Sequence, residues 1–588
     1  MKSRNLQRLL AVLLVWSICL CLAGCQTSEP KPFDLFIQEL PTQLFPANSF
    51  TLRSLFAHPE NYGFPQELCE LPFFSEQDYA DSKESTQQLL EQLHAYPYEE
   101  LSEAQQLTYD ILDDYFTRSL PLSDYYYLDN SMLGSFNGFQ ASLPLLLQES
   151  SFYNQNDLDG YFHILETTEE TFLQYAAFEE QRLAQQMGPC QTFLDGVIEQ
   201  CQNFAAEQQP FLIASINQKI DQLDFLDETQ KQQAKQRNES LLKNEFRNAY
   251  LSLADALSAL EGAPEPLGLA HFEGGKEYYT ALLQARLGTD QSVEEIWTLI
   301  EEQQKQILRR FYLLLLQYPQ TYEQFHDPYY GDFESAEQTI AFLANACVAD
   351  YPALPQLNYR VLQIPENMRE NYSPAAYVVS EIDSPLSDPQ SIYLNGAFHQ
   401  ALFPTLAHEG YPGHMYQNTY FKNLQPPLIR QLLDHPGYTE GWASYVETRS
   451  LQYAPTYAPE LEAFALNEQL SLLSICLLDI GIHYHGWEVE QAHQEALHLG
   501  FSLDLSNFSE GIYKIILENP CYYPTYIVSQ LLFEQLRATT EQALGDDFSP
   551  IEFHQVLLET GPASFPILQK QLDRYLRQKQ LSAPAQAA

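Results

Sequence analysis

The chain has 588 residues, 45% of them hydrophobic, and 78 acidic residues against 30 lysines and arginines, for a formal net charge of -48. This acidity argues against nucleic acid as a partner, because binding a phosphate backbone needs clustered cations. The length and apolar content suit a globular protein with a large core.

The N-terminus has the layout of a signal peptide. Lys2, Arg4 and Arg8 precede an uncharged apolar run that ends at Cys25, and this run is shorter than the roughly 20 residues that span a bilayer. The residues Leu22 to Cys25 resemble a bacterial lipobox, in which the cysteine is lipidated. We predict a lipoprotein signal peptide over residues 1–24, lipidation at Cys25 and a tether over residues 25–33. The alternative is an uncleaved anchor helix.

This N-terminus predicts an extracytoplasmic protein, attached to the cell membrane through its lipid anchor only. We find no later segment that is long and apolar enough to cross a bilayer.

Apolar residues three and four apart recur through most of the chain, as in amphipathic helices. Clear examples are residues 85–96, 107–116, 192–220 and 293–318. Strand patterns are short, and the best lie at residues 377–382 and 391–396. We therefore predict a mainly α protein with a small β-sheet near residues 355–396.

Prolines and glycines between Gly262 and Gly275 interrupt the helical pattern. We predict an N-terminal helical half over residues 34–270, a C-terminal half over residues 271–580 and a disordered tail over residues 581–588.

The stretch HEGYPGH, residues 408–414, contains two histidines and a glutamate. A hydrolytic zinc site needs three protein ligands, an open position for water and a carboxylate that takes the proton of that water. Histidines four residues apart share one helix face, but His408 and His414 are six apart and would lie about 120° from each other. They can share an ion only if the chain deforms at Pro412 and Gly413, since proline lacks the backbone N–H and glycine accepts unusual dihedrals. Otherwise the helix ends at Tyr411, and His414 caps it or packs in the core.

A second acidic pair follows in residues 438–450, which have a helical pattern. Glu440 and Glu447 share a face but are separated by about 10 Å along the axis, too far for both to bind one ion. One of them is the expected third ligand, and the other supports the site through a ligand. Glu440, beside Gly441, is the first choice for the ligand; an ordinary solvated helix face is the alternative.

HEGYPGH followed by EGWASYVE resembles the bacterial family called domain of unknown function 885, with its HExxPGHH and EGWA signature, which is grouped with the zincin-like metallopeptidases. Agreement extends in order over nearly all the mature chain, including GGKEYY at 274–279, DIGIHYHGW at 479–487 and PCYYPTYIVSQLLFEQLR at 520–537. The resemblance implies a large helical zincin-like metallopeptidase fold with a deep channel and a small β-sheet near the active site.

The resemblance also implies roles for single residues. His408, His414 and Glu440 take the roles of zinc ligands, and Glu409 that of the general base. Three positions depart from the family pattern. Met415 stands where the family has a second histidine, and Cys521 and Ser529 stand where it tends to have glycine.

Further candidates surround this motif. Tyr526 and Arg537, eleven residues apart and so nearly on one helix face, match family positions and are candidates to stabilise an oxyanion. His483 is another candidate, in a position behind the ligands and turned toward the site. It belongs to a group of four histidines, His483, His485, His493 and His498, in which no pair has the helical spacing of metal ligands.

Tyr393 and Asn395 are candidates to bind substrate, on an edge strand that pairs with an extended peptide. Packing in the core is the alternative for both.

Together these features predict a lipid-anchored zinc peptidase that hydrolyses peptides through a metal-activated water. One alternative is a metal-dependent hydrolase of a non-peptide amide or ester. Another is a non-catalytic lipoprotein that binds peptides.

Overall fold

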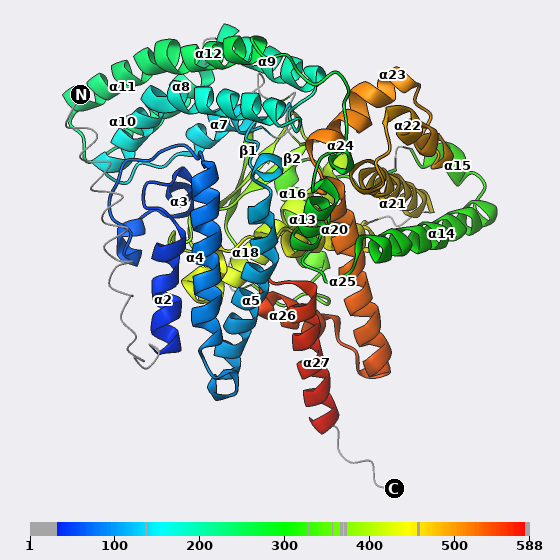
Figure 1. The fold of residues 1–588 in the computed structure, drawn as a ribbon. Coiled ribbons are helices and arrows are strands. Elements are labelled where there is room, and N and C mark those ends of the chain that lie inside the picture. Colours follow the sequence, from blue (N-terminus) through cyan, green and yellow to red (C-terminus); the bar gives the residue numbers. More distant parts are fainter. Residues whose placement is uncertain are drawn as a thin grey trace.

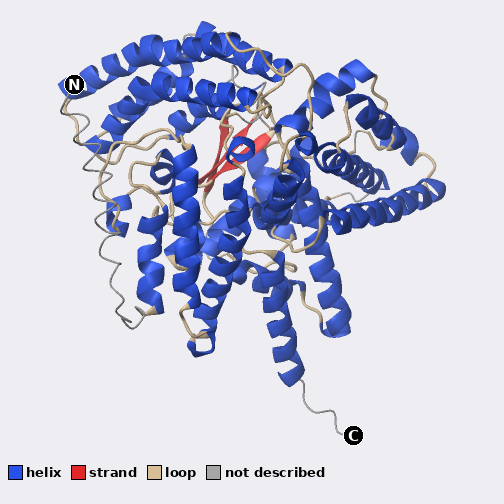
Figure 2. Cartoon of the chain, viewed as in Figure 1, coloured by secondary structure: helices blue, strands red, loops and turns tan. Residues whose placement is uncertain are grey.

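The computed structural model describes residues 32–582, except residues 136–137, 208–209, 327, 355–356, 365–368, 370–372 and 456–458. Helices dominate, and the small sheet lies among them in the middle of the molecule (Figures 1 and 2). The mainly α prediction is therefore confirmed. Cys25 and the predicted signal peptide lie outside the described residues.

The helices up to residue 258 are α2 (Phe33–Leu44), α3 (Phe50–Leu55), α4 (Glu76–His94), α5 (Glu103–Ser119), α6 (Tyr126–Asp129), α7 (Phe139–Glu149), α8 (Gln155–Ala184), α9 (Gln191–Ala206), α10 (Pro210–Asp221), α11 (Glu228–Leu241) and α12 (Arg247–Ser258). Several begin at capping boxes, such as Ser75 with Asp78 before α4 and Ser102 with Gln105 before α5. Because such a box satisfies free amides at the first turn, it fixes where a helix begins.

The helices from residue 275 onward are α13 (Gly275–Leu287), α14 (Val293–Gln317), α15 (Thr321–Gln324), α16 (Ala336–Ala346), α17 (Phe403–Glu409), α18 (His414–Asn423), α19 (Leu428–Leu432), α20 (Pro436–Ser450), α21 (Pro459–Ile480), α22 (Val489–His498), α23 (Leu505–Phe508), α24 (Lys514–Glu518), α25 (Tyr522–Leu544), α26 (Pro550–Thr560) and α27 (Phe565–Ser582). Only a short 3-10 turn lies between α12 and α13, so the expected interruption near residue 270 is present.

The sheet consists of β1 (Tyr359–Gln363), β2 (Ala375–Val378) and β3 (Gln390–Leu394) in the order β1-β3-β2. β1 runs parallel to β3 and β2 antiparallel to it. β3 is therefore the central strand, and the expectation that residues 391–396 form an edge strand is wrong. The edge next to the predicted site is β2.

The two faces of the sheet contact different parts of the chain. Ala375 and Ile392 belong to a cluster with Leu406 of α17, whereas Tyr393 packs with Leu145 of α7 on the other face. This alternation follows from the two-residue period of strands. The sheet thus lies between α17, which begins the HEGYPGH segment, and α7 of the N-terminal half.

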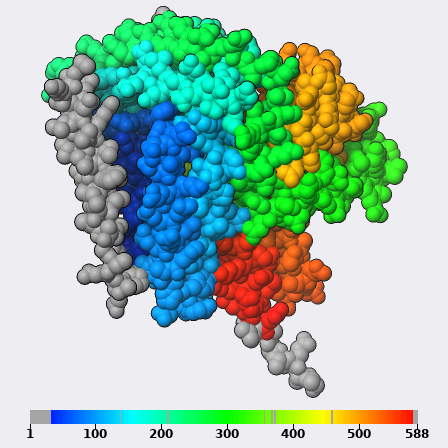
Figure 3. Space-filling model, in the orientation of Figure 1, coloured from blue at the N-terminus to red at the C-terminus, as the bar shows by residue number. Residues whose placement is uncertain are grey.

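The largest hydrophobic clusters combine distant segments. α8, α9 and α12 share one cluster, whereas α2, α4 and α5 pack with α17, α20 and the last helices. Figure 3 shows the early segment in blue beside the last helices in red, and Lys570 of α27 pairs with Asp110 of α5 at 2.6 Å. The division into two halves near residue 270 stays a prediction.

Within the described residues, the segment Pro459–His485 is long and apolar enough to cross a membrane by length and composition, which the sequence analysis did not expect. Of its apolar window, 56% is buried inside the protein. Core helices pass the same test, and α21 packs against α14 here.

Candidate metal centre

The chain between His408 and His414 is broken in the way that the spacing requires. α17 ends at Glu409 and α18 begins at His414, with a cis peptide bond between Tyr411 and Pro412. At Gly413 a Cβ atom would lie 1.7 Å from the carbonyl oxygen of His408, so only glycine fits this turn. Trp442 of α20 donates its Nε1–H to the Pro412 carbonyl at 3.0 Å and holds the turn in place.

This break brings the two imidazoles together over a carboxylate. Glu440 Oε2 lies 3.7 Å from His408 Nε2 and 3.3 Å from His414 Nε2. One ligand atom from each residue falls within 4.8 Å of the others. Two imidazoles and one carboxylate are the donor set of many hydrolytic zinc sites, so these residues fit a zinc ion.

Glu447 contacts the cluster from behind. His408 Nδ1 lies 2.9 Å from Glu447 Oε2, two helical turns beyond Glu440 on α20. A carboxylate on Nδ1 holds the tautomer that leaves Nε2 free for a metal. Gly441, the neighbour of Glu440, lies at a close contact between two helices. A Cβ atom there would lie 2.5 Å from Ser529 Cβ, so this glycine allows α25 to pack against α20.

Glu409 lies between the cluster and the sheet. Its Oε2 accepts a hydrogen bond of 2.7 Å from the backbone N–H of Tyr377 on β2. Burial raises the pKa of this carboxyl, while His408 and His414 oppose the rise. A carboxylate with a raised pKa is suited to both accept and return a proton.

His408 and Glu440 stabilise each other's charged forms. Burial disfavours the charged form of each side chain, but the contact between them outweighs this effect. The carboxylates of Glu440 and Glu447 raise the pKa of His408, and the two imidazoles lower the pKa of Glu440 to about 2. The cluster therefore offers a preformed carboxylate for a cation.

The ligands open into a cavity of about 330 Å³. It is lined by Ser373, Ala375, Tyr377, Thr405, His408, Glu409, His414, Glu440, Glu447, Tyr522 and Tyr526. This space can hold the water and substrate that a hydrolytic site requires.

Tyr526 is the predicted oxyanion donor that reaches this cavity. Its ring lies 6.3 Å from the ring of His408 at an interplanar angle of 19°. Burial and the charge of Glu440 raise the pKa of its hydroxyl, which therefore stays protonated and able to donate. Sequence reasoning missed Tyr522, whose position four residues earlier on the same helix face was the available signal.

Arg537 is not brought to the cavity. Its Nε pairs with Glu541 at 2.7 Å and its Nη1 donates to the Tyr445 hydroxyl. It lies about 16 Å along α25 from Tyr526, because eleven residues span three turns.

His483 is also placed elsewhere. Its Nδ1 accepts from the Leu269 amide at 3.2 Å, and its Nε2 lies 2.9 Å from the Ile516 carbonyl oxygen. Both ring nitrogens are used by these backbone groups, so His483 supports local packing in this structure.

The predicted substrate residues lie on or beside the central strand. The Tyr393 hydroxyl donates to Glu149 at 2.5 Å, and the Asn395 amide group donates to the Arg369 carbonyl at 2.8 Å. Neither lines the cavity. Ala375 and Tyr377 on β2 do so, and the strand pattern at 377–382 began too late to include Ala375.

Met415 is fully buried in the core beside the site. As the neighbour of His414 at a helix start, it points about 100° away from the ligand. The two-histidine cluster forms without a further histidine at this position.

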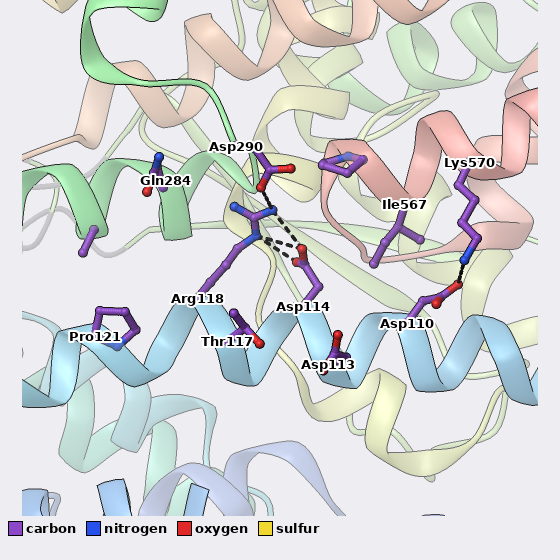
Figure 4. Close-up of a pocket in the computed structure, with 12 residues that line it drawn as sticks. Asp110, Asp113, Asp114, Thr117, Arg118, Pro121, Gln284, Asp290, Ile567 and Lys570 are labelled. Atoms are coloured by element: carbon purple, nitrogen blue, oxygen red, sulfur yellow. Dashed lines mark hydrogen bonds and ion pairs between the residues drawn. The ribbon is translucent and has the colours of Figure 1, made fainter. Parts of the chain in front are cut away.

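A second cavity rich in charge lies between α5, α13 and α27 and has a volume of about 460 Å³ (Figure 4). Arg118 contacts Asp114 at 2.8 Å and Asp290 at 2.6 Å, and Lys570 pairs with Asp110. The side chains that line it include no histidine.

The chain is similar to a bacterial protein family and to two solved structures. The profile of the family described as "Bacterial protein of unknown function (DUF885)" matches residues 60–572. The solved structure of "the putative lipoprotein from Colwellia psychrerythraea" has a TM-score of 0.79 at 18% identity and covers 93% of this chain and 99% of its own.

A second solved structure is "a putative lipoprotein of unknown function from Shewanella oneidensis", with a TM-score of 0.61 and 15% identity, covering 92% of this chain and 98% of its own. At such identities the likeness concerns the fold. No protein of curated function matches the chain.

Proposed function

The chain belongs to the DUF885 family of bacterial proteins of unknown function, and we propose that it is a zinc-dependent peptidase. The observation that carries this proposal is the convergence of His408, His414 and Glu440 on one point, with Glu409 beside them in the same cavity. A purely structural zinc site would be closed by a fourth protein ligand and would not need the carboxylate.

Each residue has a role that follows from its position. His408, His414 and Glu440 would hold the ion, and Glu447 orients His408 through Nδ1. A bound zinc ion polarises a carbonyl and lowers the pKa of water toward about 7. Glu409 takes the proton of the attacking water and passes it to the leaving nitrogen, and Tyr526 donates a hydrogen bond to the developing oxyanion.

The free edge of β2 supports a peptide as the substrate. The Tyr377 N–H bonds to Glu409 and therefore points away from β3. Because backbone groups alternate along a strand, the backbone of Ala375 is directed to the same free edge, and both residues line the cavity of the cluster. An extended peptide can pair with these groups.

We extend the proposal to the architecture and location. The site would lie in a deep channel of a zincin-like fold, and the mature protein would be attached outside the cytoplasm by a lipid on Cys25. The descriptions of the two solved relatives as lipoproteins support this location.

A single experiment tests the activity. Residues 26–588, which include every described residue, are purified with Glu409→Gln and with Glu294→Gln, an exposed glutamate of α14, as the matched control. We expect bound zinc in all three proteins. Cleavage of a mixed peptide library should fall by about 10²- to 10⁴-fold in Glu409→Gln only, the usual contribution of a general base.

The alternatives give different results in the same assay. Turnover of an amide or ester library without peptide cleavage would identify a hydrolase of another substrate class. Peptide binding without any turnover would identify a binding lipoprotein. Equal cleavage by Glu409→Gln and the parent protein would reject the mechanism.

A further inference from the structure

A third cavity, of about 590 Å³, lies on the face of the sheet that is turned away from α17. Arg360, Ser391 and Val378 line it and are register partners on β1, β3 and β2, so their side chains share one face. The opposite wall is formed by the N-terminal half, including Glu149 of α7 and Lys219 of α10. This polar cavity, the sheet–helix cavity, is separate from the metal centre.

Two cations in the sheet–helix cavity have no acidic partner among the described residues. Lys219 Nζ donates to the carbonyl oxygen atoms of Gln148 and Ser150, the latter at 2.9 Å. Arg360 donates its Nε–H to Ser391 Oγ at 3.0 Å. Neither forms an ion pair with a described carboxylate, although the chain has 78 acidic residues and 30 basic ones.

Carboxylates reach the same cavity, but hydroxyl groups occupy them. Glu149 Oε1 accepts from the Tyr393 hydroxyl at 2.5 Å. Glu381 Oε1 accepts from Ser151 Oγ at 3.0 Å and from the Tyr153 hydroxyl at 3.1 Å. Both carboxylates keep their charge, but the hydrogen bonds of these oxygen atoms come from hydroxyl groups and not from Lys219 or Arg360.

The lining also includes Arg53, Asp157 and Asp388. Arg53 and Asp157, at another part of the wall, pair with each other at 2.9 Å. Burial lowers the pKa of Lys219; the charges of Glu149 and Glu381 oppose this shift, and that of Arg360 adds to it. An incoming anion would relieve the repulsion between the two cations.

Part of the wall is apolar. Leu145, Phe152, Val378 and Val379 line the cavity, and Val379 is 51% exposed. Binding sites for small molecules combine such apolar walls with a few charged groups that fix orientation.

We propose that the sheet–helix cavity binds the carboxylate of a small molecule with an apolar side chain, either a free amino acid or the C-terminus of a peptide. Lys219 and Arg360 bind the carboxylate, and the valine and leucine side chains receive the apolar part. Charge-assisted hydrogen bonds from two cations favour a carboxylate over a neutral amide of the same shape.

The test measures binding by calorimetry to residues 26–588 that have been treated with a chelator, so no peptidase activity is needed. The probes are N-acetyl-L-leucine, which represents a peptide C-terminus, L-leucine, and N-acetyl-L-leucinamide, which lacks the carboxylate. We expect the first or the second to bind, and to bind at least about tenfold more tightly than the amide.

Variants assign the binding to this cavity. Arg360→Gln changes an exposed side chain of β1, and Lys219→Met keeps the aliphatic part of the side chain. Each should raise Kd by about tenfold or more. Lys305→Gln, on the exposed face of α14, is the control and should leave Kd unchanged.

Three outcomes would overturn the proposal: no binding of either carboxylate, equal binding of the amide, or an unchanged Kd in Arg360→Gln. Because the protein carries no metal in this test, its failure would leave the proposed peptidase activity unaffected. Conversely, absence of peptide cleavage together with this binding would reject the proposed peptidase activity and leave the proposed carboxylate site unaffected.

Discussion

The metal centre and the cavity between α5, α13 and α27 are both rich in charge, yet they differ in how the charges are paired. In the second cavity Arg118 and Lys570 neutralise Asp114, Asp290 and Asp110 directly (Figure 4). In the metal centre the carboxylate of Glu440 contacts two imidazoles, which are themselves potential ligands. A high density of charged side chains therefore does not by itself identify a metal site. A better indication is a set of metal-ligand atoms that converge on one point without a lysine or arginine that neutralises them.

Both regions combine segments that tertiary packing brings together. In the charged cavity Asp110, Asp114 and Arg118 share one face of α5, but Arg118 also contacts Asp290, and Lys570 of α27 pairs with Asp110. His408 and His414 come from two helices separated by a sharp turn, and Glu440 from a third. What distinguishes the metal centre is that the groups brought together are all potential donors to one point, which is a stronger indication of function.

Removing a ligand should have the largest effect on this comparison. His414→Ala leaves one imidazole and one carboxylate, and we expect bound zinc and peptide cleavage to fall to background. The loss of affinity should exceed the roughly 10- to 100-fold cost of losing a group behind a ligand. Metal analysis of the dialysed protein measures this, and full zinc content in the variant would remove His414 from the ligand set.

Weakening the support of a ligand should have an intermediate effect. Glu447→Gln keeps the shape of the side chain but removes the charge beside His408 Nδ1. We expect zinc affinity to fall by about 10- to 100-fold. Competition with a chromogenic chelator gives the affinity, with Glu294→Gln as the control. An unchanged affinity would make Glu447 a bystander.

Placing a histidine at the position where the family has one should act on stability. Met415 is fully buried, so Met415→His would put an imidazole in an apolar environment without a partner. We expect the free energy of unfolding to fall by about 2 kcal/mol with zinc content unchanged. Denaturant unfolding and metal analysis test both parts. Tighter zinc binding in the variant would show that this position reaches the ion.

Disrupting the paired cavity should have the smallest effect. Arg118→Met leaves Asp114 without its cation in a partly exposed setting, and we expect a loss of about 1 kcal/mol in the free energy of unfolding. Zinc affinity and cleavage should stay at the parent level. A drop in zinc affinity or in cleavage would mean that the metal centre and the cavity between α5, α13 and α27 are coupled.

Local patterns predicted much of this molecule correctly. Amphipathic periodicity located the long helices, and the short strand patterns located a sheet just before the motif. The proline and glycine after His408 predicted the deformation that the structure has at Gly413. These features could be predicted because helices, strands and turns are determined largely by residues that are close together in the sequence.

Predictions that needed long-range information fared differently. Tyr526 and Arg537 share a helix face, but only Tyr526 reaches the cavity, since the length of α25 separates them. The strand at 391–396 has an ordinary strand pattern, and only pairing with β1 and β2 makes it central. His483 has the chemistry of a ligand, but two backbone groups use its nitrogens.

The sequence by itself determined which residues have the chemistry of a zinc site and where the chain must bend for two histidines to meet. Tertiary structure alone decided that Glu440 contacts both imidazoles, that Glu447 lies behind one of them, and that the edge of β2 faces the cavity. The physical reason is that ligand types and turns are encoded by adjacent residues. Their convergence instead depends on the packing of α20 and α25 around α17, which buries side chains from distant segments.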